Sequence, residues 1–449
     1  MNQGAVAANR PGILTGAWVG LLLAVALAAV AYLAHHAAAL PFPPYDLFDW
    51  TSRRLPGGLV TFGIDTMVSI IRALGLGETS TVAKMAEQGM AIAAFLIGGA
   101  VAGGFAFVAL RNSATPAPRR RLAIVSGLLA AIVFAGIHLG VSREGDAPAL
   151  IALPWLLVLF TAWGVALGRS YDRLTPTPSA AGATVEQIDR RRFLVRLGGA
   201  TATITVVGAT LGRLLARGSN GVVGGQQPWS ATNRLPNADA RVQPVRGTRA
   251  ELTPVRDHYR IDINTRVPRV DVGTWRLRVS GLVSAERQLT LDQLRSYEPM
   301  HHFVTLECIS NRVAGDLIST TRWTGVSLQR LLADWGVRPE ATHLVIRSAD
   351  GFHEAVALDV IRGDERVMLC YEWDGLPLPR EHGAPLRIWI PDRYGMKQPK
   401  WIESIEAVGQ EHEGYWVTRG WDREARFKST AVIDNVATDM MMPSASGST

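Results

Sequence analysis

Long runs without a charged residue dominate the first half of this 449-residue chain. Residues 11–45 contain no Asp, Glu, Lys or Arg, and three more charge-free runs cover 88–110, 122–142 and 147–168. An α-helix needs about 20 apolar residues to cross the hydrocarbon core of a bilayer, and each run is long enough. The sequence therefore predicts four transmembrane helices, the first over Ile13–Leu40.

The stretch between the first two runs, residues 41–87, is broken by prolines and paired glycines. Its apolar run Leu59–Leu76 carries Asp65 and Arg72. These charges favour an interfacial or re-entrant segment over a full span.

Arginines crowd two of the loops between the apolar runs, and the loop between those two holds only Arg143. The crowded loops contain Arg111, Arg119, Arg120 and Arg121, and Arg169, Arg173, Arg190, Arg191 and Arg192. Positive residues collect in short cytoplasmic loops, so we expect both loops and the N-terminus to face the cytoplasm. This distribution also explains the net charge of +7 without a nucleic-acid partner.

A fifth apolar stretch, Leu197–Gly212, follows the run Asp189-Arg-Arg-Arg-Phe-Leu-Val-Arg. This run resembles a twin-arginine export signal, with Arg190 and Arg191 as the pair. The alternative is a basic flank on an ordinary fifth helix. Either interpretation places a fifth span over 193–216 and carries the remainder of the chain out of the cytoplasm.

The sequence thus predicts a membrane domain over 1–192, the fifth helix, a linker over 217–252 and a second domain over 253–449. Short β-rich runs bounded by turn residues characterise the second domain. They are Trp275–Val279, Phe303–Glu307, His343–Arg347, Val367–Tyr371, Leu386–Ile390 and Trp401–Ile405. The clearest helix covers Ser327–Trp335, with Ser327 as a possible N-cap. We expect a mixed α+β domain.

Two cysteines are too few for a disulfide framework or a four-thiolate zinc site. Cys308 ends an apolar strand where a polar loop begins, which would make its thiol rigid and accessible. Cys370 is flanked by apolar residues, and we expect it to pack as a small buried hydrophobe.

The stretch Val304–Arg312 resembles the molybdenum-ligand segment of the sulfite oxidase family of molybdopterin enzymes. Further blocks follow that family's order. They are Tyr259–Asn264 with Val267-Pro268 and Trp275–Gly281, then Arg322–Gly325, Ser348–Gly351, Tyr371–Arg387 and Tyr394–Trp401. The similarity covers about residues 255–410.

The resemblance implies a Mo-molybdopterin cofactor, with Cys308 as the one protein ligand to the metal. Molybdenum in high oxidation states is held by soft sulfur, which a cysteine thiolate supplies. The pterin is polar and ends in a phosphate, so it needs hydrogen-bond partners and cations. The matching positions are Tyr259, Arg260, Asp350, His382, Arg387, Gln398, Pro399 and Lys400.

Two departures from the family pattern concern the substrate site, where Cys308, Arg312 and Phe352 are the implied catalytic positions. Sulfite oxidases carry a second arginine after the one matched by Arg312, but here Val313 follows. Phe352 stands where the family has an active-site tyrosine. Losing a cation and a phenolic donor weakens binding of a dianion, so sulfite is not the expected substrate. The sequence also shows no recognisable haem domain, and the stretch after Val408 is too short for the immunoglobulin-like domain of many relatives.

Together these features predict a multi-pass protein of the cell membrane with an extracytoplasmic catalytic domain. We expect two-electron oxygen-atom transfer on a small substrate, with a quinone or a cytochrome as electron partner. The alternative is a membrane-anchored binding module on the same fold without metal turnover. His35, His36 and His138 are candidate ligands for a haem in the membrane half.

Overall fold

The computed structural model describes residues 10–111, 116–143, 145–175, 183–219 and 251–433. The chain divides into two compact units, which we call the helical unit and the sheet unit. The helical unit comprises Met1–Val60, Val82–Val222 and Ile263–Arg269, and the sheet unit comprises Thr61–Thr81, Val223–Asp262 and Val270–Thr449.

Seven α-helices occupy the described part of the first 219 residues. They are α1 (Ile13–Ala38), α2 (Pro43–Ser52), α3 (Gly57–Ala73), α4 (Thr79–Arg111), α5 (Pro116–Val141), α6 (Ala149–Leu174) and α7 (Ala183–Ser219). Among the described residues, five segments are long and apolar enough to cross a membrane. These are Ile13–Ala38, Thr79–Arg111, Ala117–Val141, Ala149–Leu174 and Arg191–Leu215. The predicted multi-pass α-helical half is confirmed.

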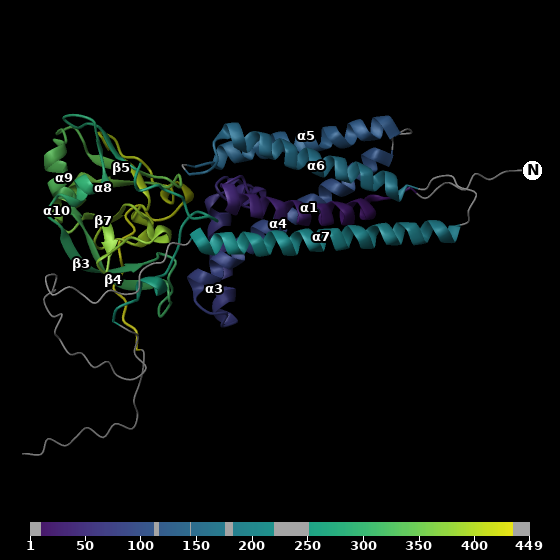
Figure 1. Ribbon diagram of the computed structural model, residues 1–449. Helices are drawn as coiled ribbons and strands as arrows, with labels where there is room; N and C mark the ends of the chain where they lie inside the picture. The colour runs from purple at the N-terminus through teal and green to yellow at the C-terminus, as the bar shows by residue number, and fades with distance from the viewer. Residues whose placement is uncertain (1–9, 112–115, 144, 176–182, 220–250, 434–449) are drawn as a thin grey trace, which may run out of the picture. The chain divides into compact units, whose positions relative to one another are not determined.

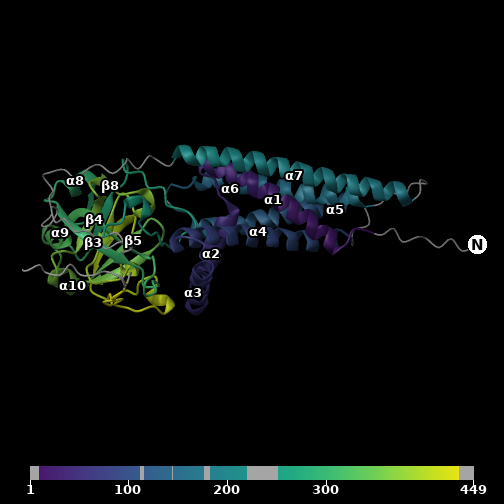
Figure 2. The same ribbon diagram turned by 90° about the horizontal axis from the view of Figure 1, so that it is seen from below.

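Small residues allow the long helices to approach one another closely. A Cβ atom at Gly20 of α1 would lie against the backbone of Gly99 and Gly103 of α4, and one at Gly127 of α5 would lie against Phe160 of α6. Glycine at such crossings brings helix backbones together in lipid, where van der Waals packing drives association. Helix α1 also packs along α7, and α5 along α6, as Figure 1 and Figure 2 show.

The stretch predicted as interfacial forms α2 and α3, and neither qualifies as a span. Helix α7 begins at Ala183, so Arg190 and Arg191 lie inside it rather than before it. The predicted linker over 217–252 falls largely outside the described residues.

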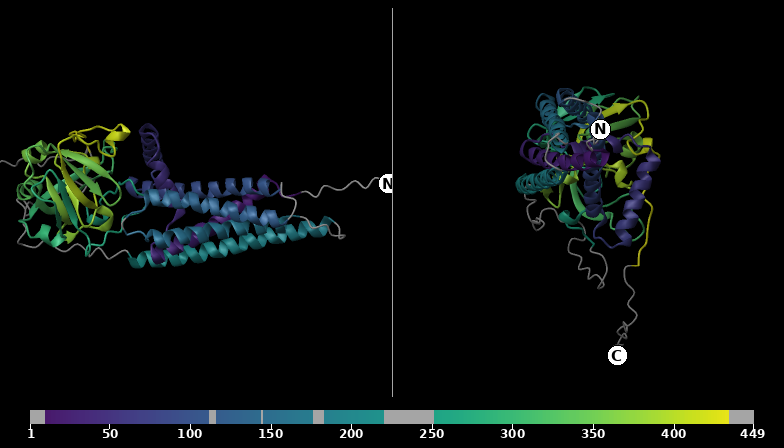
Figure 3. Two further views of the ribbon diagram at one scale, coloured as in Figure 1. Left: turned by 90° about the horizontal axis from the view of Figure 1, so that it is seen from above. Right: turned by 90° about the vertical axis from the view of Figure 1, so that its right-hand side faces the viewer.

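The second half contains ten strands among the described residues. They are β1 (Leu277–Gly281), β2 (Arg287–Leu289), β3 (Met300–Glu307), β4 (Ile318–Ser327), β5 (His343–Ser348), β6 (His353–Ala357), β7 (Met368–Trp373), β8 (Leu376–Pro377), β9 (Arg387–Trp389) and β10 (Ile402–Val408). One sheet has the order β2-β1-β10-β5-β6, and the other has β3-β4-β7-β8 with β9 paired to β7. Figure 3 shows these strands from above and from the side. The predicted α+β domain is confirmed.

All six predicted strands are present, with small shifts of their ends, but β2, β4, β6 and β8 were not predicted. Short helices complete the domain: α8 (Leu291–Arg295), α9 (Leu328–Trp335) and α10 (Leu358–Gly363). Ser327 is the N-cap residue of α9, as predicted, but its hydroxyl makes no hydrogen bond to the first turn of the helix. Its hydroxyl donates instead to the Glu365 carbonyl, 3.2 Å away, because the chain enters α9 directly from β4.

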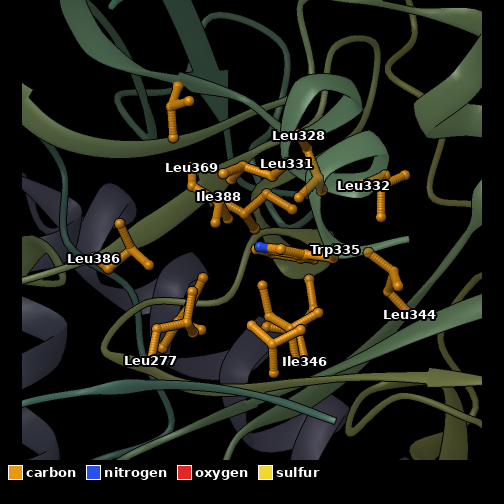
Figure 4. Packing of buried hydrophobic residues seen from close by; sticks show 14 of the residues in the cluster. Leu277, Leu328, Leu331, Leu332, Trp335, Leu344, Ile346, Leu369, Leu386 and Ile388 are labelled. Atoms are coloured by element: carbon orange, nitrogen blue, oxygen red, sulfur yellow. The ribbon is translucent and has the colours of Figure 1, made fainter. Parts of the chain in front are cut away.

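Two hydrophobic clusters support the domain. The larger one packs α9 against β1, β5, β9 and β10, with the Trp335 ring among Leu277, Leu328 and Ile346 (Figure 4). The smaller one contains Cys308 and Tyr259 together with Trp323, Trp373 and Trp389. Two of the residues implied as the cofactor site, Tyr259 and Cys308, therefore belong to this smaller core.

Candidate active site

Cys308 is the first residue after β3, as predicted, and it is held by backbone bonds on both sides. Its N–H donates to the Leu317 carbonyl at 3.0 Å, and its carbonyl accepts from Asn311 N–H at 2.9 Å. Its side chain is less accessible than predicted, because the residue is only 9% exposed. Burial raises the pKa of the thiol, although hydrogen bonds from Ser310 act in the opposite direction. A bound metal cation is the kind of group that would favour the thiolate here.

The Asn311 side chain fastens the loop that follows Cys308. Its Nδ2 donates to Oε1 of buried Glu307 at 2.8 Å, and its Oδ1 accepts from Leu317 N–H at 3.1 Å. The strand before the cysteine and the chain ten residues later are thus joined through one amide. Cys308 is therefore part of a closed, rigid loop.

A stack of aromatic rings lies beside this loop. The His258 ring lies 4.4 Å from that of Trp373, measured between centroids, and 5.2 Å from that of His382. Burial lowers the pKa of His258 to about 3 and that of His382 well below its ordinary value. Both imidazoles are therefore neutral at physiological pH, where each ring has one donor and one acceptor nitrogen.

Arg387 brings a positive charge into the same stack. Its Nη1 donates to the His382 carbonyl at 3.0 Å, and its guanidinium lies 4.4 Å above the Trp323 ring and 5.1 Å from the Trp373 ring. Burial lowers the pKa of Arg387 to about 10, so it stays charged at neutral pH. A buried cation on aromatic faces suits the anionic end of a ligand.

Lys400 supplies a second buried cation. Its Nζ donates to the Ile261 carbonyl at 3.1 Å and lies 3.3 Å from Oδ2 of Asp262, which also accepts from Arg260 Nε at 2.7 Å. Burial lowers the pKa of Lys400 to about 8, while the Asp262 carboxylate opposes that shift. Arg260 and Lys400 are thus held by one shared carboxylate.

The structure brings most of the implied cofactor positions together. The charges of Arg260, Arg387 and Lys400 all lower the pKa of His382. Asp350 raises the pKa of Lys400, and Tyr259 raises that of Arg387. These six residues form one cluster. Gln398 and Pro399 support it from the turn before β10. Gln398 Nε2 donates to the Arg393 carbonyl at 2.8 Å, and the Pro399 carbonyl accepts from Ile388 N–H.

The other two implied catalytic positions contact different partners. Exposed Arg312 donates from Nη2 to Ser69 Oγ at 2.7 Å. Phe352 is buried, donates its N–H to Asp350 Oδ1 at 2.9 Å and packs near Tyr415, with 5.6 Å between ring centroids. Asp350 therefore links Phe352 to the cofactor cluster.

Several polar residues of this region were not predicted to contribute. His258 and Asp262 adjoin Tyr259 and Arg260 in the sequence, which was the available signal. Trp323 and Trp373 lie within the segments that resemble the family, but an apolar ring in the sequence did not indicate a ligand contact. Asn311 was visible as part of the Ser-Asn-Arg turn, but its bond to Glu307 required the structure.

Unsatisfied polar atoms in this region fit a polar ligand such as a pterin. Five buried side-chain atoms in this region have no hydrogen-bond partner within the described residues. They are His258 Nε2, Trp323 Nε1, Trp373 Nε1, Arg387 Nε and Gln398 Oε1. Buried polar atoms are ordinarily paired, so this concentration indicates a polar ligand. A Cβ at Gly395 would lie 2.9 Å from the Tyr259 hydroxyl, so glycine at this position lets the chain pass close to Tyr259.

The histidines of the helical unit make local contacts. His35 Nδ1 donates to the Leu40 carbonyl at 2.9 Å, and His138 Nδ1 donates to Asp46 Oδ2 at 2.9 Å. The His36 ring packs edge-on against Tyr32. Haem ligation by these residues stays a prediction.

Comparison with known proteins identifies the second half. Residues 264–416 match the family model described as the oxidoreductase molybdopterin binding domain. Mitochondrial sulfite oxidase of Rattus norvegicus is 31% identical over 179 residues, which cover 34% of this chain and 33% of that protein. The match thus spans about a third of the sulfite oxidases.

Two bacterial relatives match over the same part. The uncharacterized oxidoreductase YuiH of Bacillus subtilis is 28% identical, covering 34% of this chain and 74% of its own length. The putative protein-methionine-sulfoxide reductase subunit YedZ1 of Azospira oryzae is 27% identical, covering 35% of this chain and 57% of its own. With the Cys308 loop and the polar cluster, these matches show that residues 264–416 form a molybdopterin-binding oxidoreductase domain of the sulfite oxidase type, whose cofactor is Mo-molybdopterin.

Proposed function

We propose that this protein is a membrane-anchored molybdenum oxidoreductase that transfers an oxygen atom to or from a small substrate outside the cytoplasm. The observation that carries this proposal is the placement of Cys308 on a closed loop beside a buried cluster with two cations and five unsatisfied polar atoms. Such a site suits an anionic pterin whose metal needs one thiolate from the protein.

The cofactor, when bound, supplies the two-electron redox chemistry and the site of oxygen-atom transfer. The chain's own residues bind and orient it. Cys308 would provide the thiolate, Arg387 and Lys400 would hold the anionic group, and the neutral His258 and His382 would offer one donor and one acceptor each. Asn311 holds the loop, so the ligand sulfur stays fixed during turnover.

The proposed substrate class is a neutral oxygen donor or acceptor such as a sulfoxide. Val313 is 68% exposed on the metal-ligand loop where sulfite oxidases carry an arginine, and buried Phe352 offers no hydroxyl. For a sulfoxide the balanced half-reaction takes two electrons and two protons and gives the sulfide and water. The name of the Azospira relative, a putative protein-methionine-sulfoxide reductase subunit, supports this class.

The proposed location follows from the apolar helices and the arginine distribution. An odd number of spans with a cytoplasmic N-terminus puts the catalytic domain outside, and Arg190-Arg191 would direct a cofactor-loaded domain to the twin-arginine route. A quinone or a cytochrome at the membrane would exchange the electrons.

Metal analysis and steady-state kinetics of the purified protein test this function. We expect molybdenum and pterin in equal amounts, with turnover of small sulfoxides or another neutral substrate in a screen using artificial electron donors and acceptors. Pterin without molybdenum, or full metal without turnover of any screened substrate, would favour the alternative of a binding module on the same fold.

A further inference from the structure

We propose that Ile263–Arg269 is a docking segment that binds the helical unit through its own side chains, so that the two halves of the chain stay together when the sequence between α7 and residue 251 is cut. Seven residues of the chain leave the sheet unit here. Asp262 before them and Val270 after them belong to the sheet unit, whereas the seven pack with α2, α4 and the loop between α5 and α6.

Arg266 makes the central contacts of the docking segment. Its Nη2 lies 3.0 Å from Asp46 Oδ1, and its Nη1 lies 3.4 Å from Asp146 Oδ1. The Asp46 side chain is 1% exposed and also accepts from His138. Burial alone would lower the pKa of Arg266, but the carboxylates of Asp46, Asp146 and Asp49 raise it above its ordinary value. The guanidinium is thus a buried cation surrounded by acidic groups of the helical unit.

Thr265 makes a second set of contacts through Asp49. Asp49 Oδ1 accepts from both the N–H of Thr265, at 3.2 Å, and its hydroxyl, at 2.9 Å. The other oxygen of Asp49 lies 3.3 Å from Arg143 Nη2. Asp49 is 1% exposed, so its carboxylate is shielded from water and interacts with Thr265 and Arg143 instead.

The backbone of the segment is held as well. Lys84 Nζ donates to the Asn264 carbonyl at 2.8 Å, and Gln88 Nε2 donates to the Thr265 carbonyl at 3.2 Å. Arg53 Nη2 donates to Asn264 Oδ1 at 3.3 Å. Three consecutive residues are therefore recognised through both side chains and carbonyl oxygens, as a bound peptide would be.

This contact set has the properties of a specific interface rather than of a loose connection. Its charges are buried and complementary, so removing one partner leaves the other unpaired, and such losses weaken an interface by about a hundredfold or more. Buried pairs are also poorly screened by salt. The five spans that we describe all end by Leu215, so after a cut between α7 and residue 251 the second half stays attached through these contacts and through those that Thr61–Thr81 make within the sheet unit, such as Ser69 with Arg312.

The test uses the full chain with a protease recognition sequence inserted within residues 225–245 and an affinity tag at the N-terminus. After cleavage in detergent, the resin is washed with high salt, and the fraction of the C-terminal fragment that stays bound is measured. The variants are Arg266→Ala and Arg266→Lys. Arg256→Ala is the matched control, because the Arg256 side chain is 83% exposed and its ion pair within the described residues is with its neighbour Asp257.

We expect the unmodified fragments and those of Arg256→Ala to stay together, the C-terminal fragment of Arg266→Lys to be lost in part, and that of Arg266→Ala to be lost to the greatest extent. Asp49→Asn should also weaken retention, because the N–H and hydroxyl of Thr265 then donate to a neutral amide oxygen instead of a carboxylate. Each uncleaved variant is first shown to elute as one species, which separates release from misfolding. Separation of the unmodified fragments on cleavage, or equal retention of Arg266→Ala and the control, would overturn the proposal.

Discussion

The Asn311 amide nitrogen lies 2.8 Å from the Glu307 carboxylate, so two residues on either side of Cys308 are hydrogen-bonded to each other. Glu307 is buried at the end of β3, and Asn311 also accepts from the backbone of Leu317. A single side chain therefore fixes the entry and the exit of the ligand loop.

Replacement of Asn311 by alanine should loosen this loop. Asn311→Ala leaves the Glu307 carboxylate and the Leu317 N–H buried without their partner, at a cost of about 2 kcal/mol or more. We expect the thermal midpoint to fall by about 4 to 8 °C and the molybdenum content to drop. Thr305→Ala is the control, because it removes only the exposed hydrogen bond between the Thr305 and Thr320 hydroxyls and should change stability little. Equal effects of the two variants would contradict this role of Asn311.

Cys308 and Cys370 should respond differently to serine. Cys308→Ser removes the soft donor, so we expect loss of turnover while pterin stays largely bound through Arg387, Lys400 and the ring stack. Cys370 is fully buried, burial raises its thiol pKa to about 12, and its Sγ donates to the Glu372 carbonyl. Cys370→Ser should keep the metal and most activity. Molybdenum and pterin analyses alongside kinetics distinguish the two, and normal turnover by Cys308→Ser would refute its assignment as ligand.

His353 should make the sheet unit sensitive to acid. Burial, with the charges of His412, Arg347 and Arg419, lowers the pKa of His353 from 6.5 to about 4. Between these values the unfolded chain binds more protons than the folded one, so this contribution to stability is complete above pH 6.5 and is lost as the pH falls towards 4. His353→Gln removes the titration and should flatten the decline of the thermal midpoint over that window. An unchanged slope would show that other groups govern it.

Several parts of the site could be predicted because they depend on neighbouring residues. The end of β3 at Cys308 and the burial of Cys370 followed from apolar runs and their flanks. Strand β4 was missed because Ser319, Thr320, Thr321 and Arg322 look like a polar loop. In the structure β4 lies between β3 and β7, and the β-branched threonines suit a strand paired on both sides.

Contacts between distant residues could not be predicted in this way. The stacking of His258 on Trp373 and the contact of Lys400 with Asp262 join residues more than 100 positions apart. The docking of residues 263–269 among helices is a further case. The family resemblance placed these residues at the start of the catalytic domain, and only their buried partners show where they pack.

The arginine pair in α7 should decide the route of export. Arg190→Lys combined with Arg191→Lys keeps the positive charge of the segment, so an ordinary basic flank would act as before. An export receptor that recognises two arginines would not bind the double variant. We expect the catalytic domain of the double variant to be protected from protease added outside the cytoplasmic membrane, whereas that of the unmodified protein is cleaved. Unchanged accessibility would show that the pair is an ordinary basic flank.

Substrate choice should depend on Val313 and Phe352. Each lost hydrogen bond to a charged oxygen is worth about 1.5 to 3 kcal/mol, or roughly ten- to a hundredfold in binding. The unmodified protein should therefore turn over sulfoxides better than sulfite. Val313→Arg combined with Phe352→Tyr should raise kcat/KM for sulfite while lowering or sparing that for sulfoxides, whereas Val313→Leu should leave the ratio unchanged. Steady-state kinetics with both substrates measure this ratio. Efficient sulfite oxidation by the unmodified protein would show that a cation from elsewhere in the pocket replaces the missing arginine, and that the two departures do not set the substrate.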